Sequence, residues 1–302
     1  YQWKKNGVDI VGATSRTLFI TDLNASQHEG NYTVVISNAF GSVTSSLAQI
    51  DVNGSLTEGL IAWWPFDGNA SDMSGNSHHG TVSGATLGKD RNGEINSVYE
   101  FDGLNDYIEV QDSSKFSFGQ NDFSISAWVL RKSKGTGASG MILSQWNTGA
   151  NPGSNEWILQ SKSGSSAALG YPSFVVEIGS NSTSIHSPKE IHIDTWRHLL
   201  VLRKGSDLIL YFDGDVVAVQ KNVSGPLNDT GRKLFIGKFR DQNPIFSNIA
   251  VDDLRIYDRA LSTVEVKALY ELGEQPVQGS GSGTTTVVNG TVADGSITAS
   301  KI

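Results

Sequence analysis

The loop between Asp67 and Asn76 gathers residue types that could bind a metal ion in this 302-residue chain. Asp67, Asp72 and Asn76 supply carboxylate and amide oxygens, and Gly68 and Gly75 allow the backbone to turn carbonyl groups inward. Ca²⁺ takes about six to eight oxygen ligands of this kind. We therefore expect a structural calcium ion at this loop. The alternative is that the same side chains only cap the loop as Asx turns.

Two tryptophans flank a second polar loop. Trp146 precedes residues 147–155 and Trp157 closely follows them. An exposed indole on such a loop can stack on the apolar face of a sugar ring, because it presents a large flat surface with one polar atom. The sequence thus predicts ligand binding at Trp146 and Trp157. The alternative is that both rings belong to the core.

The acidic residues do not form a recognisable catalytic set. Glycoside hydrolysis needs two facing carboxylates, and a Glu-x-Asp-x-x-Glu string that would place them along one strand is missing from the sequence. The alternating pairs Glu100/Asp102 and Asp213/Asp215 each run into an Asp-Gly turn, which explains them more simply. A Gly-x-Ser-x-Gly string and cysteine are also missing, so these nucleophile motifs are excluded. We predict that the chain is not an enzyme.

The composition favours an all-β fold. Hydrophobic residues make up 38% of the chain, and 33 glycines with only 7 prolines suit many short strands joined by glycine turns. The formal net charge of −8 argues against nucleic-acid binding, which usually requires a basic face. No apolar run approaches the length that spans a bilayer. We expect neither a nucleic-acid partner nor a membrane span.

The closing segment gives the strongest indication of fold. Residues 249–257 alternate as a strand, and Ser262 with Glu265 has the Ser-x-x-Glu spacing of a capping box, which predicts a helix start. With the opening string 61–68 and the alternating strand 123–129, this segment resembles the laminin-G-like jelly-roll family over residues 60–274.

That resemblance implies a concanavalin-like sandwich of two antiparallel sheets packed face to face. Similar jelly rolls hold a calcium ion between the loop after the opening strand and the last strand. The resemblance therefore adds Asp252 and Asp253 to Asp67, Asp72 and Asn76 as expected ligands.

Residues 1–52 resemble the second half of an immunoglobulin-like domain. Tyr32 follows Gly30 where that family places its tyrosine corner, and Val34 stands where antibody domains carry cysteine. The strands that the family places before Trp3 are not in the sequence. We expect either that a longer chain supplies them or that another chain donates a strand.

The remaining residues form a linker at 53–59 and a segment at 275–302 that combines a Gly/Ser linker with a β-prone tail. We expect that Thr284 to Val288 could complete a neighbouring copy's first domain, which would build an end-to-end filament.

The function expected from these features is that of a non-catalytic extracellular surface protein. It would be a structural or adhesive subunit whose laminin-G-like module binds a glycan or a protein, and it could self-assemble through the tail. The alternative is a carbohydrate-binding module of a secreted protein that targets polysaccharides.

Overall fold

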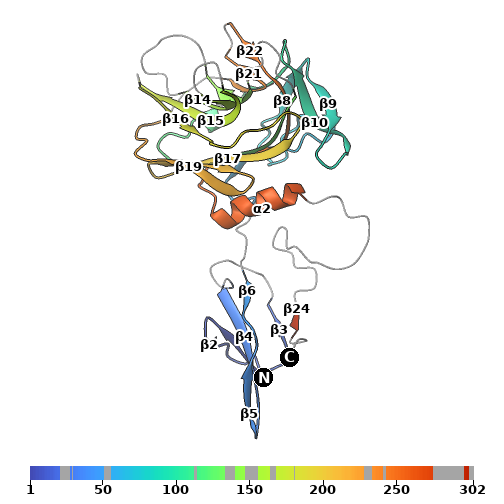
Figure 1. Cartoon of the computed structure of the whole chain (residues 1–302), viewed down its shortest axis with the longest axis vertical. Coiled ribbons are helices and arrows are strands. Elements are labelled where there is room, and N and C mark those ends of the chain that lie inside the picture. The colour runs from blue at the N-terminus through green and yellow to red at the C-terminus, as the bar shows by residue number, and fades with distance from the viewer. Residues whose placement is uncertain are drawn as a thin grey trace. The chain divides into compact units, whose positions relative to one another are not determined.

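The computed structural model describes residues 1–20, 28, 30–50, 56–111, 114–132, 140–146, 156–163, 168–179, 181–227, 233–240, 243–274 and 296–298. Apart from one α-helix and one 3-10 helix, the regular elements of the described residues are strands, which confirms the predicted all-β fold class. The chain divides into two compact units, Tyr1–Glu58 with Ser280–Ile302, and Gly59–Gly279 (Figure 1). The expected tail strand at 284–288 and the loop 147–155 lie outside the described residues.

The first unit contains a five-stranded antiparallel sheet. Its strands are β1 (Gln2–Lys5), β2 (Val8–Asp9), β4 (Gly30–Asn38), β5 (Gly41–Thr44) and β6 (Ala48–Ile50). The order is β2-β1-β4-β5, and β6 also pairs with β4. A second sheet pairs β3 (Thr17–Phe19) with β24 (Ser296–Thr298).

A small core holds the first unit together. Trp3, Leu18, Tyr32 and Val34 are buried in one cluster, so Val34 is part of the apolar packing of this unit. The Tyr32 hydroxyl donates a hydrogen bond to the His28 carbonyl at 2.9 Å. This contact has the form of a tyrosine corner, and the immunoglobulin-like identity of the unit stays a prediction.

The large unit is a sandwich of two main sheets. The eight-stranded sheet, here sheet I, has the order β19-β18-β17-β12-β23-β10-β9, with β7 paired to β23. Its strands are β7 (Leu60–Trp64), β9 (Thr86–Lys89), β10 (Ile95–Asp102), β12 (Phe123–Arg131), β17 (Trp196–Lys204), β18 (Asp207–Phe212), β19 (Asp215–Gln220) and β23 (Asn248–Tyr257).

The seven-stranded sheet, here sheet II, has the order β16-β15-β14-β13-β20-β11-β8. Its strands are β8 (Gly80–Ser83), β11 (Tyr107–Val110), β13 (Met141–Gln145), β14 (Trp157–Ser163), β15 (Ala168–Ile178), β16 (Asn181–His186) and β20 (Leu234–Ile236). A short 3-10 helix, η1 (Ser114–Phe116), follows β11.

The core lies between the two sheets because alternate residues of each strand point inward. In β12 the inward residues include Phe123 and Ile125, and in β15 they include Phe174. The same alternation acts in β7, where the pleat turns Trp64 inward and leaves Trp63 partly exposed on the other face.

The outer face of sheet I is covered by helix α2 (Thr263–Glu274), which lies across it in Figure 1. The predicted capping box is confirmed: the Ser262 N–H donates to Glu265 Oε2 at 2.7 Å, and the Glu265 N–H donates to Ser262 Oγ at 3.3 Å. Tyr270 stacks on Trp128 of β12, with ring centroids 5.7 Å apart. A Cβ at Gly273 would come within 2.2 Å of the Trp128 indole, so only glycine allows this close approach.

A hairpin carries the chain from sheet II to sheet I. It consists of β21 (Lys238–Phe239) and β22 (Ile245–Phe246), between β20 and β23. Gly237 redirects the chain with φ of 78°, and a Cβ there would approach the Phe101 ring to 2.4 Å. In the large unit, Figure 1 shows this hairpin on the side away from α2.

Candidate ligand-binding surface

The predicted calcium loop is organised around Asp72. Its carboxylate accepts hydrogen bonds from the backbone N–H groups of Trp63, Ser74 and His78, at 2.8 to 2.9 Å, and from the Ser74 hydroxyl. Burial alone would raise the pKa of Asp72, but these hydrogen bonds outweigh it and hold the pKa below its ordinary value.

The other two loop residues expected to bind calcium have different surroundings. Asp67 is exposed, and the Asn76 amide donates hydrogen bonds to the carbonyls of Leu60 and Ile61. The Asn76 amide thus acts as a donor that ties the loop to strand Leu60–Trp64. This arrangement is the loop-cap alternative.

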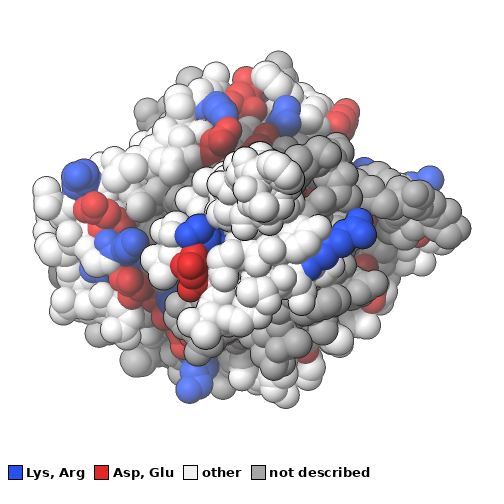
Figure 2. Space-filling model, turned by 90° about the horizontal axis from the view of Figure 1, so that it is seen from below, with Lys and Arg blue, Asp and Glu red and all other residues white. Residues whose placement is uncertain are grey.

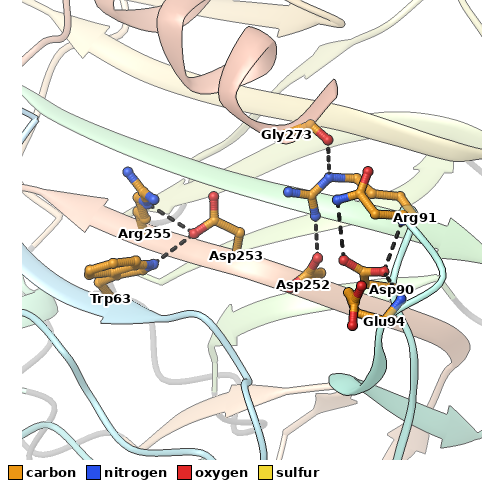
Figure 3. Close-up of polar contacts among 9 residues, drawn as sticks. Trp63, Asp90, Arg91, Glu94, Asp252, Asp253, Arg255 and Gly273 are labelled. Atoms are coloured by element: carbon orange, nitrogen blue, oxygen red, sulfur yellow. Dashed lines mark hydrogen bonds and ion pairs between the residues drawn. The ribbon is translucent and has the colours of Figure 1, made fainter. Parts of the chain in front are cut away.

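The two aspartates of β23 form separate contacts (Figure 3). Asp253 accepts a hydrogen bond from the Trp63 indole at 2.7 Å and pairs with Arg255 at 3.0 Å. Asp252 pairs with Arg91, whose guanidinium also donates to the Gly273 carbonyl. Burial raises the pKa of Asp252 to about 8, although the positive charge of Arg91 acts in the opposite direction.

These five residues, as they are arranged, do not fit a calcium ion. The oxygens of Asp72, Asp252 and Asp253 already accept hydrogen bonds from protein donors that a cation would have to replace. Among the described residues, no group of three or more His, Asp or Glu side chains converges as metal ligands would. Calcium binding stays a prediction. The observed geometry instead favours a role for these side chains as hydrogen-bond partners of protein groups.

The two tryptophans predicted to bind a ligand differ in their exposure to solvent. Trp157 is fully buried, and its indole donates to Gln145 Oε1 at 3.0 Å, so the interpretation as an exposed sugar platform is wrong. The pleat of β14 turns this side chain into the core. Trp146 follows the end of β13, remains partly exposed and contacts Phe239 of β21, with ring centroids 5.6 Å apart.

Trp146 and Phe239 form a surface with a cation at its border. The Arg240 guanidinium lies 5.1 Å from the centre of the Phe239 ring, and its Nε donates to the Asn243 carbonyl at 3.0 Å. Arg240 has a φ of 61°, a backbone conformation that long side chains rarely adopt. The hairpin turn thus holds an arginine beside two partly exposed aromatic rings.

The opposite side of the hairpin carries further aromatic groups. The Lys238 ammonium lies 4.3 Å from the Tyr107 ring centre and 4.1 Å from that of Phe235. Phe246, opposite Lys238 in the hairpin, also contacts Tyr107. We call Trp146, Phe239 and Arg240 the aromatic hairpin surface. Lys238 is itself buried on the opposite side and does not belong to it.

Sequence reasoning found only Trp146 of this surface. Phe239 and Arg240 lie more than ninety positions further along the chain than Trp146. The string Lys238-Phe239-Arg240, with alternating cationic and aromatic residues before a polar turn, was the available signal. Its position beside Trp146 depends on the crossover between the sheets, which the sequence does not reveal.

A serine and a histidine are paired beneath α2 but closed to a substrate. Ser126 Oγ lies 2.8 Å from His198 Nε2, and both residues are buried. Burial lowers the pKa of His198 to about 3, so the ring is neutral at ordinary pH. The rings of Trp128 and Tyr270 pack against this histidine. The pair is part of the packing under the helix.

The charges on the face shown in Figure 2 are mixed in sign. Lysine and arginine side chains lie among aspartates and glutamates, with no broad basic area among the residues coloured there. A nucleic-acid backbone is usually met by a continuous basic face. In the part of the chain that the structure describes, no helix is long and apolar enough to cross a membrane.

Comparison of the sequence with known protein families identifies the family of the large unit. Residues 101–267, more than half of the chain, match the model of the concanavalin A-like lectin/glucanases superfamily (Laminin_G_3). The chain therefore belongs to this family, as the predicted laminin-G-like resemblance implied. The comparison with curated proteins found no match for the chain.

Solved structures share the fold at low sequence identity. The binding domain of Paraclostridial Mosquitocidal Protein 1 is 20% identical, with a TM-score of 0.55 over 71% of this chain and 52% of that one. Domain 4 of AbnA, an extracellular arabinanase from Geobacillus stearothermophilus, was solved with arabinotriose. It is 19% identical, with a TM-score of 0.55 over 70% of this chain and 98% of that one.

The binding domain of botulinum neurotoxin DC, solved with rat synaptotagmin II, is 14% identical, with a TM-score of 0.55 over 73% of this chain. The match spans only about half of each of the two toxin domains, at 52% and 53%. Together these likenesses show that the large unit shares its fold with these domains.

Proposed function

We propose that the large unit is a non-catalytic carbohydrate-binding module that holds a glycan on the aromatic hairpin surface. The observation that carries this proposal is the partly exposed pair Trp146 and Phe239 bordered by Arg240. Aromatic rings of this kind supply flat apolar area, and a nearby guanidinium supplies donors for hydroxyl oxygens. Ligand sites commonly combine such apolar walls with a few polar groups.

The non-catalytic part of the proposal rests on the acidic and histidine groups of the described residues. The carboxylates of Asp72, Asp252 and Asp253 are bound to protein donors, and His198 is enclosed. None of these groups faces a partner across an open space in the way that glycoside hydrolysis requires.

Binding is tested by isothermal titration calorimetry with a defined panel: arabinotriose, xylotriose, cellotriose and laminaritriose. We expect at least one sugar to bind the native chain and Trp146→Ala to weaken that binding about tenfold, which is roughly 1.4 kcal/mol. Trp63→Ala is the matched control, because Trp63 is also partly exposed but lies on sheet I. Equal loss in both variants, or no binding to any sugar, contradicts the proposed site.

Catalysis is tested separately with the matching polysaccharides. Long incubation should release no new reducing ends above those of the buffer control. A rate of release that survives purification and disappears on mutation of a single carboxylate would show that the chain is an enzyme.

We also propose a structural and adhesive role outside the cell, in which the large unit binds a glycan or a protein while copies associate through the first unit. The observation that favours this second role is the pairing of the C-terminal strand β24 with β3. Labelling of intact source cells with an antibody to the large unit should detect the chain at the surface. Signal that appears only after the cells are broken contradicts this location.

A further inference from the structure

Strand β3 of the first unit stands outside the five-stranded sheet. Among the described strands it pairs with β24 alone, in an antiparallel register that sets Leu18 opposite Ile297 and Thr17 opposite Thr298. Leu18 is only 8% exposed and packs with Trp3 in the small core. Because a two-strand ribbon is marginal by itself, a strand that carries a core residue depends on its partner.

That partner comes from the other end of the sequence. Ser296–Thr298 follows a Gly/Ser-rich stretch that begins after Glu274. Strand pairing is made by backbone N–H and C=O groups, so the same register can be offered to β3 by an identical segment of another molecule. Exchange of an identical element between copies is a low-cost route to assembly.

The geometry points to β3 as a strand-acceptor edge whose partner is the Ser296–Thr298 segment of a second copy. This inference rests on the proposed structural role and is independent of glycan binding. Such a contact joins the C-terminal segment of one chain to the N-terminal unit of the next. Head-to-tail contacts of this kind that do not close into a ring extend into filaments.

Exposed apolar side chains on the first unit support association between copies. Such side chains are found on β2, on β5 and in the turns beside them, and include Val8 (70% exposed), Val11 (99%), Phe40 (100%), Val43 (48%) and Leu47 (59%). Exposed apolar area of this kind marks association surfaces, and β5 is an edge strand of its sheet. A tethered strand competes with exchange at an effective concentration on the order of millimolar, so exchange is favoured when copies are crowded.

Cysteine crosslinking tests the exchange directly, because the native chain contains no cysteine. Thr17→Cys and Thr298→Cys are made in separate full-length chains that carry tags of different size. Directly opposite residues of an antiparallel pair lie about 4.5–5.5 Å apart at Cα, which a disulfide can bridge. We expect oxidation of the mixture to give a mixed disulfide dimer whose yield rises with protein concentration.

The controls separate exchange from collision and from pairing within one chain. Thr17→Cys mixed with Lys267→Cys, an exposed position of α2, should give far less mixed dimer. A double variant that crosslinks only within single chains, while the mixture gives none, overturns the inference. Absence of any crosslink in either sample overturns the β24–β3 pairing as well.

A second measurement avoids cysteine. Ile297→Pro removes a backbone donor from β24, and Ile297→Val keeps the donor and the β-branched shape. Light scattering at high concentration should show larger assemblies for the native chain and Ile297→Val, and monomers for Ile297→Pro. Glycan titration of the same samples should be unchanged, so failure of assembly and failure of sugar binding are distinguished. Equal mass for all three chains contradicts strand exchange.

Discussion

Two tryptophan–arginine clusters of the large unit lead to opposite outcomes. On sheet I, Trp128 is 1% exposed, and the Arg91 guanidinium lies 4.6 Å from its ring centre beneath α2. At the hairpin, Trp146 stays partly exposed beside Phe239 and Arg240. The residue types are nearly the same, but the helix closes the first cluster. Whether such a cluster stabilises the fold or offers a binding surface therefore depends on what covers it.

The largest expected effect is on the covered side of this comparison. Trp128→Ala removes a buried ring that contacts Tyr270, His198 and Arg91, so we expect the free energy of unfolding to fall by about 3–5 kcal/mol. Trp146→Ala should change it by less than about 1 kcal/mol, because that ring is partly exposed. Urea unfolding of both variants measures the difference. Similar losses for the two would mean that the hairpin cluster is also structural.

Asp72 should give the next largest effect. Asp72→Ala leaves the backbone N–H groups of Trp63, Ser74 and His78 without their acceptor, which should cost about 3 kcal/mol of unfolding free energy. The loss should be the same with and without EDTA, since those donors occupy the carboxylate. If EDTA lowers the melting temperature of the native chain but not of Asp72→Ala, calcium is bound there after all.

The fold was largely predictable because its signals are local. The Ser262/Glu265 spacing alone placed the start of α2, and the Asp213-Gly214 pair correctly marked the turn between β18 and β19, where both residues have positive φ. Alternation placed residues 123–129 in a strand. It did not decide which of the adjacent residues Trp63 and Trp64 faces the core, which the pleat of β7 settles in favour of Trp64.

The candidate site was less predictable because it depends on contacts between distant segments. Asp72 and Asp253 both bind Trp63, one through the backbone and one through the indole, and this link requires β7 to lie beside β23. The sequence identified the oxygen-rich residues but not the donors that occupy them. Likewise Trp146 was recognised as a candidate, whereas Phe239 and Arg240 become its neighbours only through the crossover hairpin.

A smaller effect is expected at the edge of the hairpin surface. Arg240→Gly removes the guanidinium and relieves the positive φ of that position, so stability should rise slightly while sugar affinity falls about threefold, or roughly 0.7 kcal/mol. Titration with the best sugar of the panel, together with urea unfolding, measures both quantities. An unchanged affinity would restrict the binding surface to the aromatic rings.

The smallest effect concerns the second buried aspartate of the covered face. Burial raises the pKa of Asp252 to about 8, above the unfolded value near 4, so the folded chain keeps a proton that the unfolded chain releases. Its contribution to stability is therefore present at low pH and is lost as the pH rises through about 8. We therefore expect the native chain to lose stability relative to Asp252→Asn between pH 5 and pH 8.5, and urea unfolding at the two pH values measures the loss.

Asp72 has the opposite sign, which makes it the internal comparison for Asp252. Its pKa is lowered, so its stabilisation is present above about pH 4 and is lost only as the pH falls further. Unfolding of Asp252→Asn, Asp72→Asn and the native chain at both pH values therefore isolates one group from the other. If the native chain instead becomes more stable relative to Asp252→Asn as the pH rises, the stabilisation from the ion pair with Arg91 exceeds the cost of burying the Asp252 charge. The covered face would then be stabilised by charge as well as by packing.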